Sequence, residues 1–166
     1  PVLIIAMMIS AVWGGSLAVV IWSVGIGFGV NIARVTRPEL RRVLHSDFVL
    51  AGRASGLTPL QNLWRHLMPN VAPVFIVQLS WGMAVAVLAE AGLSYLGFGA
   101  PVTEPSWGLL LAELQQYITV YPLSVLWPGL AITFTVLGLN LLGDALREAT
   151  DPTLSRGRDR LHPPRG

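Results

Sequence analysis

Side chains capable of catalysis or metal binding are sparse in this chain. It contains no cysteine, so thiol catalysis, disulfides and cysteine-ligated metal centres are excluded. Its three histidines, His45, His66 and His162, do not cluster, and we assign no metal site. The glycine-rich stretch 25–29 lacks the Lys-Ser/Thr pair of a phosphate-binding loop. We therefore expect no catalytic residue and no cofactor.

The elements that carry the few polar residues are predicted to be membrane helices. Of the 166 residues, 53% are hydrophobic and only 12% are charged, whereas a soluble domain carries roughly a quarter charged residues. Three stretches, 1–33, 66–89 and 114–143, lack Asp, Glu, Lys and Arg altogether. Each exceeds the ~20 helical residues that cross a bilayer core. The alternative, a long buried core helix, would normally show a polar stripe. We predict an all-α, polytopic transmembrane bundle rather than a soluble enzyme or a disordered chain.

Glycines and prolines divide these stretches into spans. The turn signal Gly14-Gly15-Ser16 separates two helices within the first stretch. The predicted spans cover residues 2–13 (in part), 17–33, 71–96 and 123–142. A helix of 12 residues reaches only ~18 Å. We therefore expect the first helix to be a truncated span, and the chain to lack an N-terminal part.

The arginines predict how the spans are oriented. Six of them fall within 34–69 and the other five follow residue 144, whereas 97–122 has no arginine and two glutamates. Positive residues favour the cytoplasmic side, which puts 34–69 and the C-terminus in the cytoplasm and 97–122 outside. This alternation agrees with the number of spans. We expect residues 1–150 to form the transmembrane domain and 151–166 a flexible cytoplasmic tail.

The predicted cytoplasmic loop is long enough to hold structure of its own. Helix start and stop signals predict a helix beginning at 36–39, a second over 48–55 capped by Asp47 and ended by a left-handed Gly56, and a third over 59–67 capped by Thr58 with Gln61 and stopped by Pro69. The middle helix is rich in small residues that let another surface approach closely, with Phe48 and Val49 as an apolar anchor. From the residues alone, docking to a partner and lying on the lipid surface are equally supported.

Polar residues within the spans are candidates for function. Glu90 is a carboxylate at the end of a long uncharged stretch, and an intramembrane carboxylate is a functional candidate by default. The alternative is a structural residue near the outer interface, hydrogen-bonded within its own Ala-Glu-Ala-Gly turn. Gln78, Trp81 and Met83 lie on the same predicted span and are candidates for lining a transport path. Gln78 has the alternative of bonding to a neighbouring helix.

The loop resembles a known sequence pattern. The stretch DFVLAGRASG (47–56), followed by LMPN (67–70), resembles the E-A-A loop of ABC-importer permeases. Further stretches are similar to the dipeptide, oligopeptide and nickel branch of that family: LAEAGLSYLGFG (88–99), PSWG (105–108), PGL (128–130), NLLGDALR (140–147), and Asp151-Pro152 with Leu154. In this order and spacing they resemble the C-type permease of the pair.

The resemblance implies a type I importer permease with short cytoplasmic coupling helices, in a bacterial or archaeal cytoplasmic membrane. Implied partners are the lipid bilayer, a second permease subunit in a heterodimer, two ATPase subunits that hydrolyse the ATP, and an extracytoplasmic solute-binding protein, with no nucleic acid. The implied cargo is di- or oligopeptides, with nickel or another small solute as the alternative. The implied ATPase-docking residues are Asp47, Phe48, Val49, Leu50, Ala51, Gly52, Arg53, Ala54, Ser55 and Gly56, and Pro69 and Asn70 end the loop.

The chain departs from the family pattern at two positions. Leu50 stands where the family usually has Glu, and Gly52 replaces the second Ala, while Gly56 and Pro69 are kept. In the family that Glu helps to hold the coupling helix or pairs with the ATPase, so the departure bears on how this helix docks, and an inactive permease is the alternative. Because the motif around Glu90 is shared across substrates, the resemblance favours its structural role. A secondary transporter or channel is the alternative of another class, and would need paired intramembrane charges.

Overall fold

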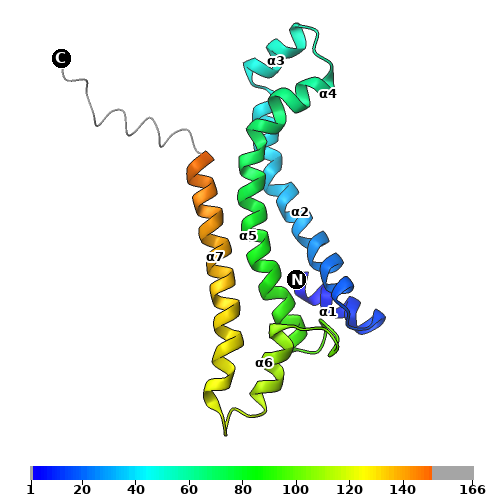
Figure 1. The fold of residues 1–166 in the computed structure, drawn as a ribbon. Coiled ribbons are helices and arrows are strands. Elements are labelled where there is room, and N and C mark those ends of the chain that lie inside the picture. Colours follow the sequence, from blue (N-terminus) through cyan, green and yellow to red (C-terminus); the bar gives the residue numbers. More distant parts are fainter. Residues whose placement is uncertain (1, 151–166) are drawn as a thin grey trace, which may run out of the picture. The chain divides into compact units, whose positions relative to one another are not determined.

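Helices are the only regular elements among residues 2–150, the part of the chain that the computed structural model describes. They are α1 (Val2–Trp13), α2 (Leu17–Leu44), α3 (Asp47–Ala54), α4 (Pro59–Asn62), the π-helical turn η1 (Leu63–Leu67), α5 (Met68–Tyr95), α6 (Trp107–Gln115), the 3-10 turn η2 (Pro122–Val125) and α7 (Leu126–Thr150) (Figure 1). The prediction of an all-α chain is confirmed. The predicted tail 151–166, with the motif Asp151-Pro152 and Leu154, lies outside the described residues.

In the described part of the chain, three helical stretches are long and apolar enough to cross a membrane: Leu17–Leu44, Pro59–Tyr95 and Pro122–Thr150. They overlap the spans predicted over 17–33, 71–96 and 123–142, and each is longer than the predicted span. The apolar helix α1 has 12 residues and is shorter than a span. Large apolar side chains lie exposed along all of these helices, including Trp22, Phe134 and Leu141. Such exposure is costly in water and favourable in lipid.

Two predicted helix boundaries are wrong, and both involve proline. The sequence predicts a break after residue 33 and a new helix at 36–39, but α2 runs on to Leu44 with Pro38 inside it. A proline in a helix removes one backbone hydrogen bond. Here the last turn is also held by tertiary packing, because Leu40, Val43 and Leu44 belong to an apolar cluster.

Pro69 likewise does not end the helix before it. The chain is helical from Pro59 through the π-helical turn into α5, and this continuous helical stretch ends at Tyr95. In that turn the Met68 N–H reaches back five residues to the Leu63 carbonyl. The Asn70 side-chain Nδ2 donates to the His66 carbonyl oxygen at 2.6 Å. Proline has no backbone N–H. On either side of Pro69, the Met68 N–H and the Asn70 side chain donate hydrogen bonds to helix carbonyl groups.

The described residues form two compact units. The first unit comprises 2–31 and 81–140, and the second unit comprises 32–80 and 141–150. Each has its own apolar cluster. That of the first unit is built on Ala6, Val20, Val24, Ala89 and Leu93, and that of the second on Val43, Val49, Leu67 and Val71.

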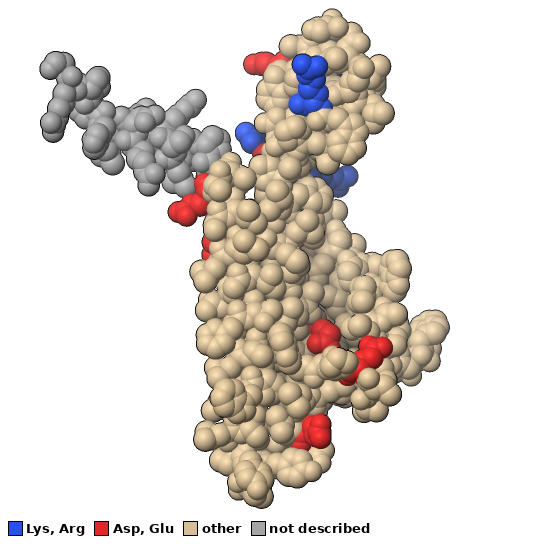
Figure 2. Space-filling model, in the orientation of Figure 1, with Lys and Arg blue, Asp and Glu red and all other residues tan. Residues whose placement is uncertain are grey.

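The two units differ in charge. The charged side chains of the first unit are three glutamates, Glu90, Glu104 and Glu113, whereas all the arginines among residues 2–150 belong to the second unit. On the face shown in Figure 2, arginines gather over the second unit and the first unit shows only carboxylates. This is the same asymmetry from which the sequence predicts the orientation of the spans.

Candidate functional site

The first candidate region is the short helix α3 in the second unit. It begins at Asp47, and Ser46, with extended backbone angles, holds the N-cap position. The sequence predicts Asp47 as the cap and a helix over 48–55, so the observed helix lies one residue earlier. The Asp47 carboxylate therefore sits in the first turn, where the helix dipole favours negative charge.

The end of α3 is fixed by a glycine turn. Gly56 has φ +83°, its N–H bonds to the Arg53 carbonyl at 3.1 Å, and the Leu57 N–H bonds to the Gly52 carbonyl at 3.1 Å. This pair of bonds is a Schellman motif, which needs a left-handed residue at the Gly56 position. The predicted left-handed Gly56 is confirmed.

One face of α3 is attached to the chain's own second unit. Val49 is only 2% exposed and packs in the apolar cluster with Leu67 and Val71. The Asn62 Nδ2 donates to the Val49 carbonyl oxygen at 3.0 Å, and a Cβ added at Gly52 would lie 3.0 Å from Asn62 Oδ1. Val49 and Gly52 therefore face inward, whereas the sequence predicts them as an apolar anchor and a close-approach surface for a partner.

The other face of α3 is exposed. Phe48 and Leu50 are 43% and 48% exposed, and the Phe48 ring lies tilted against His66, with ring centroids 6.1 Å apart. The remaining exposed docking candidates are Asp47, Ala51, Arg53, Ala54, Ser55 and Gly56. This face combines two large apolar side chains and several small ones with the charges of Asp47 and Arg53. Of these residue types, aromatic residues and arginine are the ones enriched in protein interfaces.

The following helix, α4, begins with a reciprocal cap. The Gln61 N–H bonds to Thr58 Oγ1 at 3.3 Å, and the Thr58 N–H bonds to Gln61 Oε1 at 3.0 Å. This confirms the capping box predicted from the sequence. Both hydrogen bonds of this cap are local, and they join residues at the start of the long helical stretch Pro59–Tyr95.

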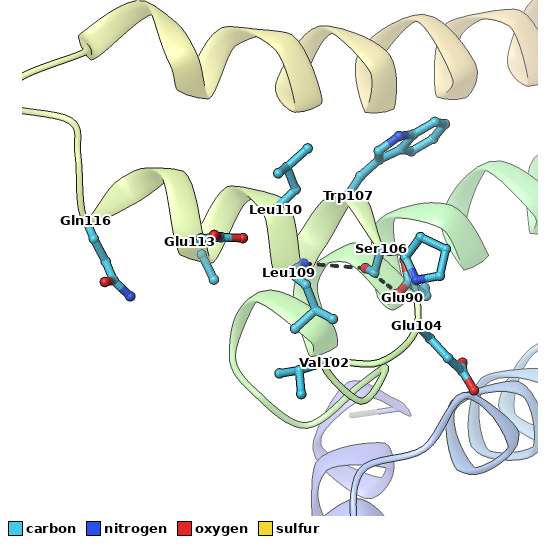
Figure 3. Close-up of a pocket in the computed structure, with 11 residues that line it drawn as sticks. Glu90, Val102, Glu104, Ser106, Trp107, Leu109, Leu110, Glu113 and Gln116 are labelled. Carbon is cyan, nitrogen blue, oxygen red and sulfur yellow. Dashed lines mark hydrogen bonds between the residues drawn. The ribbon is translucent and has the colours of Figure 1, made fainter.

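The second candidate region surrounds Glu90 in the first unit. Glu90 Oε1 accepts a hydrogen bond from Ser94 Oγ at 2.7 Å. It also accepts one from Ser106 Oγ at 2.8 Å (Figure 3). Ser106 Oγ in turn accepts from the N–H groups of Gly108 and Leu109, which start α6. Glu90 therefore joins the end of α5 to the cap of α6, rather than bonding only within its own turn.

The same two elements also touch through their backbones. A Cβ added at Gly108 would overlap the carbonyl oxygen of Ala91 and lie 2.8 Å from its carbonyl carbon. Farther along, the Tyr95 hydroxyl donates to Gln115 Oε1. Helix α6 is thus held against α5 at its start, in its first turn and at its end. The sequence signal that was missed is Ser106, an N-cap residue directly before Trp107.

A pocket of about 820 Å³ lies beside these contacts, and Figure 3 shows the side chains that line it. Its wall combines three carboxylates, Glu90, Glu104 and Glu113, with the apolar side chains of Val102, Trp107, Leu109 and Leu110. All of these residues except Glu90 come from the segment 102–116. The segment predicted to lie outside the membrane is therefore a folded, acidic surface rather than a plain connection.

The predicted path residues fall in different units. Gln78 belongs to the second unit and lines a pocket of about 610 Å³ with Asn70, Pro69 and Arg147. Trp81 and Met83 belong to the first unit and are about half exposed. The Trp81 ring packs edge-on against the Phe28 ring, with the two ring centroids 6.3 Å apart. All three lie on the helix α5, and their role in lining a path stays a prediction.

Comparison with known proteins gives a consistent set of relatives. Residues 1–156 match the family described as binding-protein-dependent transport system inner membrane component. A probable peptide ABC transporter permease protein of Sinorhizobium fredii is 34% identical over 158 residues, covering 95% of this chain and 54% of that protein. A putative peptide transport system permease protein of Brucella suis is 37% identical over 154 residues, covering 93% and 52%.

A dipeptide transport system permease protein of Escherichia coli is 34% identical over 156 residues, covering 94% of this chain and 52% of that protein. The chain thus spans about half the length of the curated relatives it matches. In all three cases the match includes both candidate regions, since it covers more than nine tenths of this chain.

Proposed function

We propose, because the chain belongs to the family of binding-protein-dependent transport system inner membrane components, that it acts as a permease subunit of an ATP-driven importer. The three apolar helical stretches supply the membrane-spanning part. ATP hydrolysis is assigned to separate ATPase subunits. The exposed helix α3 receives their movement, and the membrane helices open and close the path in response.

The observation that carries this proposal is the construction of α3. Its inner face is tied to the second unit by Val49 and Asn62, and its end is set by Gly56. Its outer face presents Phe48, Leu50 and Ala51 to the surroundings. A short helix that is rigidly mounted and apolar outside can transmit a push, whereas a flexible loop would absorb it.

The charge distribution supports an orientation. The second unit carries the arginines of the described residues and is placed on the cytoplasmic side, and the acidic segment 97–122 is placed outside. There segment 97–122, with its pocket, is available to the solute-binding protein. A second permease subunit completes the path.

Single cysteines test this orientation, and these 166 residues contain no cysteine of their own that would react. Val102 is 91% exposed and Ala51 is exposed on α3. In intact cells, Val102→Cys is expected to react with a membrane-impermeant maleimide, and Ala51→Cys is expected to react only after the membrane is permeabilised. The reverse pattern would overturn the orientation.

The cargo is proposed to be di- or oligopeptides, on the strength of the relatives named for peptide and dipeptide transport. The decisive experiment reconstitutes the full-length protein with its co-expressed permease and ATPase partners and its binding protein. Labelled dipeptide is expected to enter proteoliposomes only with ATP, and the ATPase is expected to co-purify. Uptake of nickel instead would correct the cargo, and ATP-independent uptake without an ATPase would favour a secondary transporter or channel.

A further inference from the structure

Asn62 is a buried polar residue between two helices of the second unit. It is 5% exposed, lies at the end of α4, and donates from Nδ2 to the carbonyl oxygen of Val49 in α3 at 3.0 Å. Its Oδ1 has no hydrogen-bond donor among residues 2–150. Within the described residues, the one hydrogen bond of this amide therefore joins α4 to α3, thirteen residues earlier in the chain.

That bond defines one register of α3 on α4. The apolar contacts around Val49 are non-directional and tolerate a small slide or rotation of the helix. A hydrogen bond needs the donor within about 3.2 Å and near-linear geometry, so rotating α3 breaks it. A broken bond would leave the Asn62 amide buried without any partner, which is unfavourable.

Gly52 is matched to the same side chain. A Cβ added there would lie 3.0 Å from Asn62 Oδ1 and 3.2 Å from Leu57 Cδ1, closer than ordinary contacts between such atoms. With glycine at this position, the amide lies directly against the α3 backbone. Gly52 and Asn62 therefore act as one pair, in which the absence of a side chain makes room for the amide.

We propose that Asn62 is a positioning residue for the docking helix: through Val49 and Gly52 it holds α3 in one register on the helical stretch Pro59–Tyr95, so that a displacement of α3 moves that stretch. This inference rests on the proposed function. Asn62 need not touch an ATPase, because it is buried. It determines instead how much of the movement of α3 reaches the membrane helix.

A double-mutant cycle tests the pair in the full reconstituted transporter. The quantity measured is the coupling ratio, the number of solute molecules transported per ATP hydrolysed. Asn62→Ala is expected to lower it at least threefold while ATP hydrolysis continues. Gly52→Ala alone is expected to lower it, because its methyl group displaces the amide. In the Asn62→Ala background the same change is expected to cause no further loss, and full additivity of the two losses would overturn the proposal.

Asn62→Leu separates positioning from stability. Leucine is close to asparagine in shape but cannot donate to the Val49 carbonyl, so the fold is expected to keep its thermal midpoint while the coupling ratio falls. The control is Thr58→Ala, which removes the hydrogen bond from the Gln61 N–H to the Thr58 hydroxyl and does not alter α3. This variant is expected to lower the thermal midpoint of unfolding. The control is expected to keep the ratio. A ratio that falls in proportion to the midpoint in all variants would show a purely structural role.

This outcome is distinguishable from failure of the proposed function. If Ala51→Arg on the outer face leaves transport unchanged, the docking role of α3 fails, whatever the cycle shows. If Ala51→Arg abolishes transport while the cycle is additive, docking stands and Asn62 has no positioning role.

Discussion

Replacing Ala51 by arginine is expected to abolish ATP-driven uptake without removing the protein from the membrane. Ala51 is exposed on the outer face of α3, next to Leu50. A long charged side chain there keeps the partner surface at a distance and buries an unpaired charge beside Arg53. Since such a charge costs an interface roughly 2–5 kcal/mol, uptake and ATPase retention should fall at least ~10-fold. Labelled-peptide uptake and quantitative co-purification measure the two effects.

The matched control is Ala149→Arg. Ala149 is also an exposed helical alanine of the second unit, on α7, so this variant adds the same side chain away from α3. It should retain near-normal uptake and ATPase binding. Equal losses in both variants would mean that a general charge effect, and not the docking face, explains the result.

Replacing Gly108 by alanine is expected to detach α6 from the end of α5. The new methyl group would overlap the backbone carbonyl of Ala91, which cannot rotate away as a side chain could. Overpacking of this kind costs ~1–3 kcal/mol. Separation of the helices would also break the Ser106–Glu90 hydrogen bond, and bonds to charged groups contribute ~1.5–3 kcal/mol each. The thermal midpoint should fall, and protease cleavage within 97–106 should accelerate at least ~10-fold, as expected for a loss of 1.4 kcal/mol or more.

Gly92→Ala is the internal comparison for this prediction. Gly92 lies in α5, and a Cβ added there meets no atom within 4 Å. Alanine should be neutral or slightly stabilising, since glycine in a helix costs up to ~1 kcal/mol relative to alanine. If Gly108→Ala were as well tolerated as Gly92→Ala, the close contact between α5 and α6 would be refuted.

The features that the sequence predicts well depend on residues close together in the chain. The capping box joins Thr58 and Gln61, three positions apart in the chain. The left-handed turn at Gly56 depends on hydrogen bonds to carbonyl groups in the last turn of α3. The three apolar stretches are predicted because span length follows directly from bilayer thickness.

The features that it misses depend on partners far apart in the chain. Pro38 sits inside α2, whose last turn packs in a cluster that includes Leu67 and Val71, and no local signal reports that packing. The Glu90–Ser106 bond spans 16 residues and the Asn62–Val49 bond spans 13. Local rules treat Val49 as a free apolar residue, whereas the fold buries it.

Leu50 illustrates how the structure refines the doubt raised by the missing glutamate. Its side chain is 48% exposed and belongs to the outer face of α3. The helix is held instead from its inner face, by Val49 in the apolar cluster and by the amide of Asn62. In this structure α3 is therefore held in place without a glutamate at position 50.

The most direct measurement of the central claim is a cross-link from α3 to the ATPase subunit in the assembled transporter. Ala51→Cys, modified with a short photoactivatable maleimide, would be compared with Val102→Cys carrying the same reagent. We expect a permease–ATPase adduct from position 51 and none from position 102. Absence of an adduct from position 51, in complexes that still hydrolyse ATP and transport solute, would contradict the assignment of α3 as the docking helix.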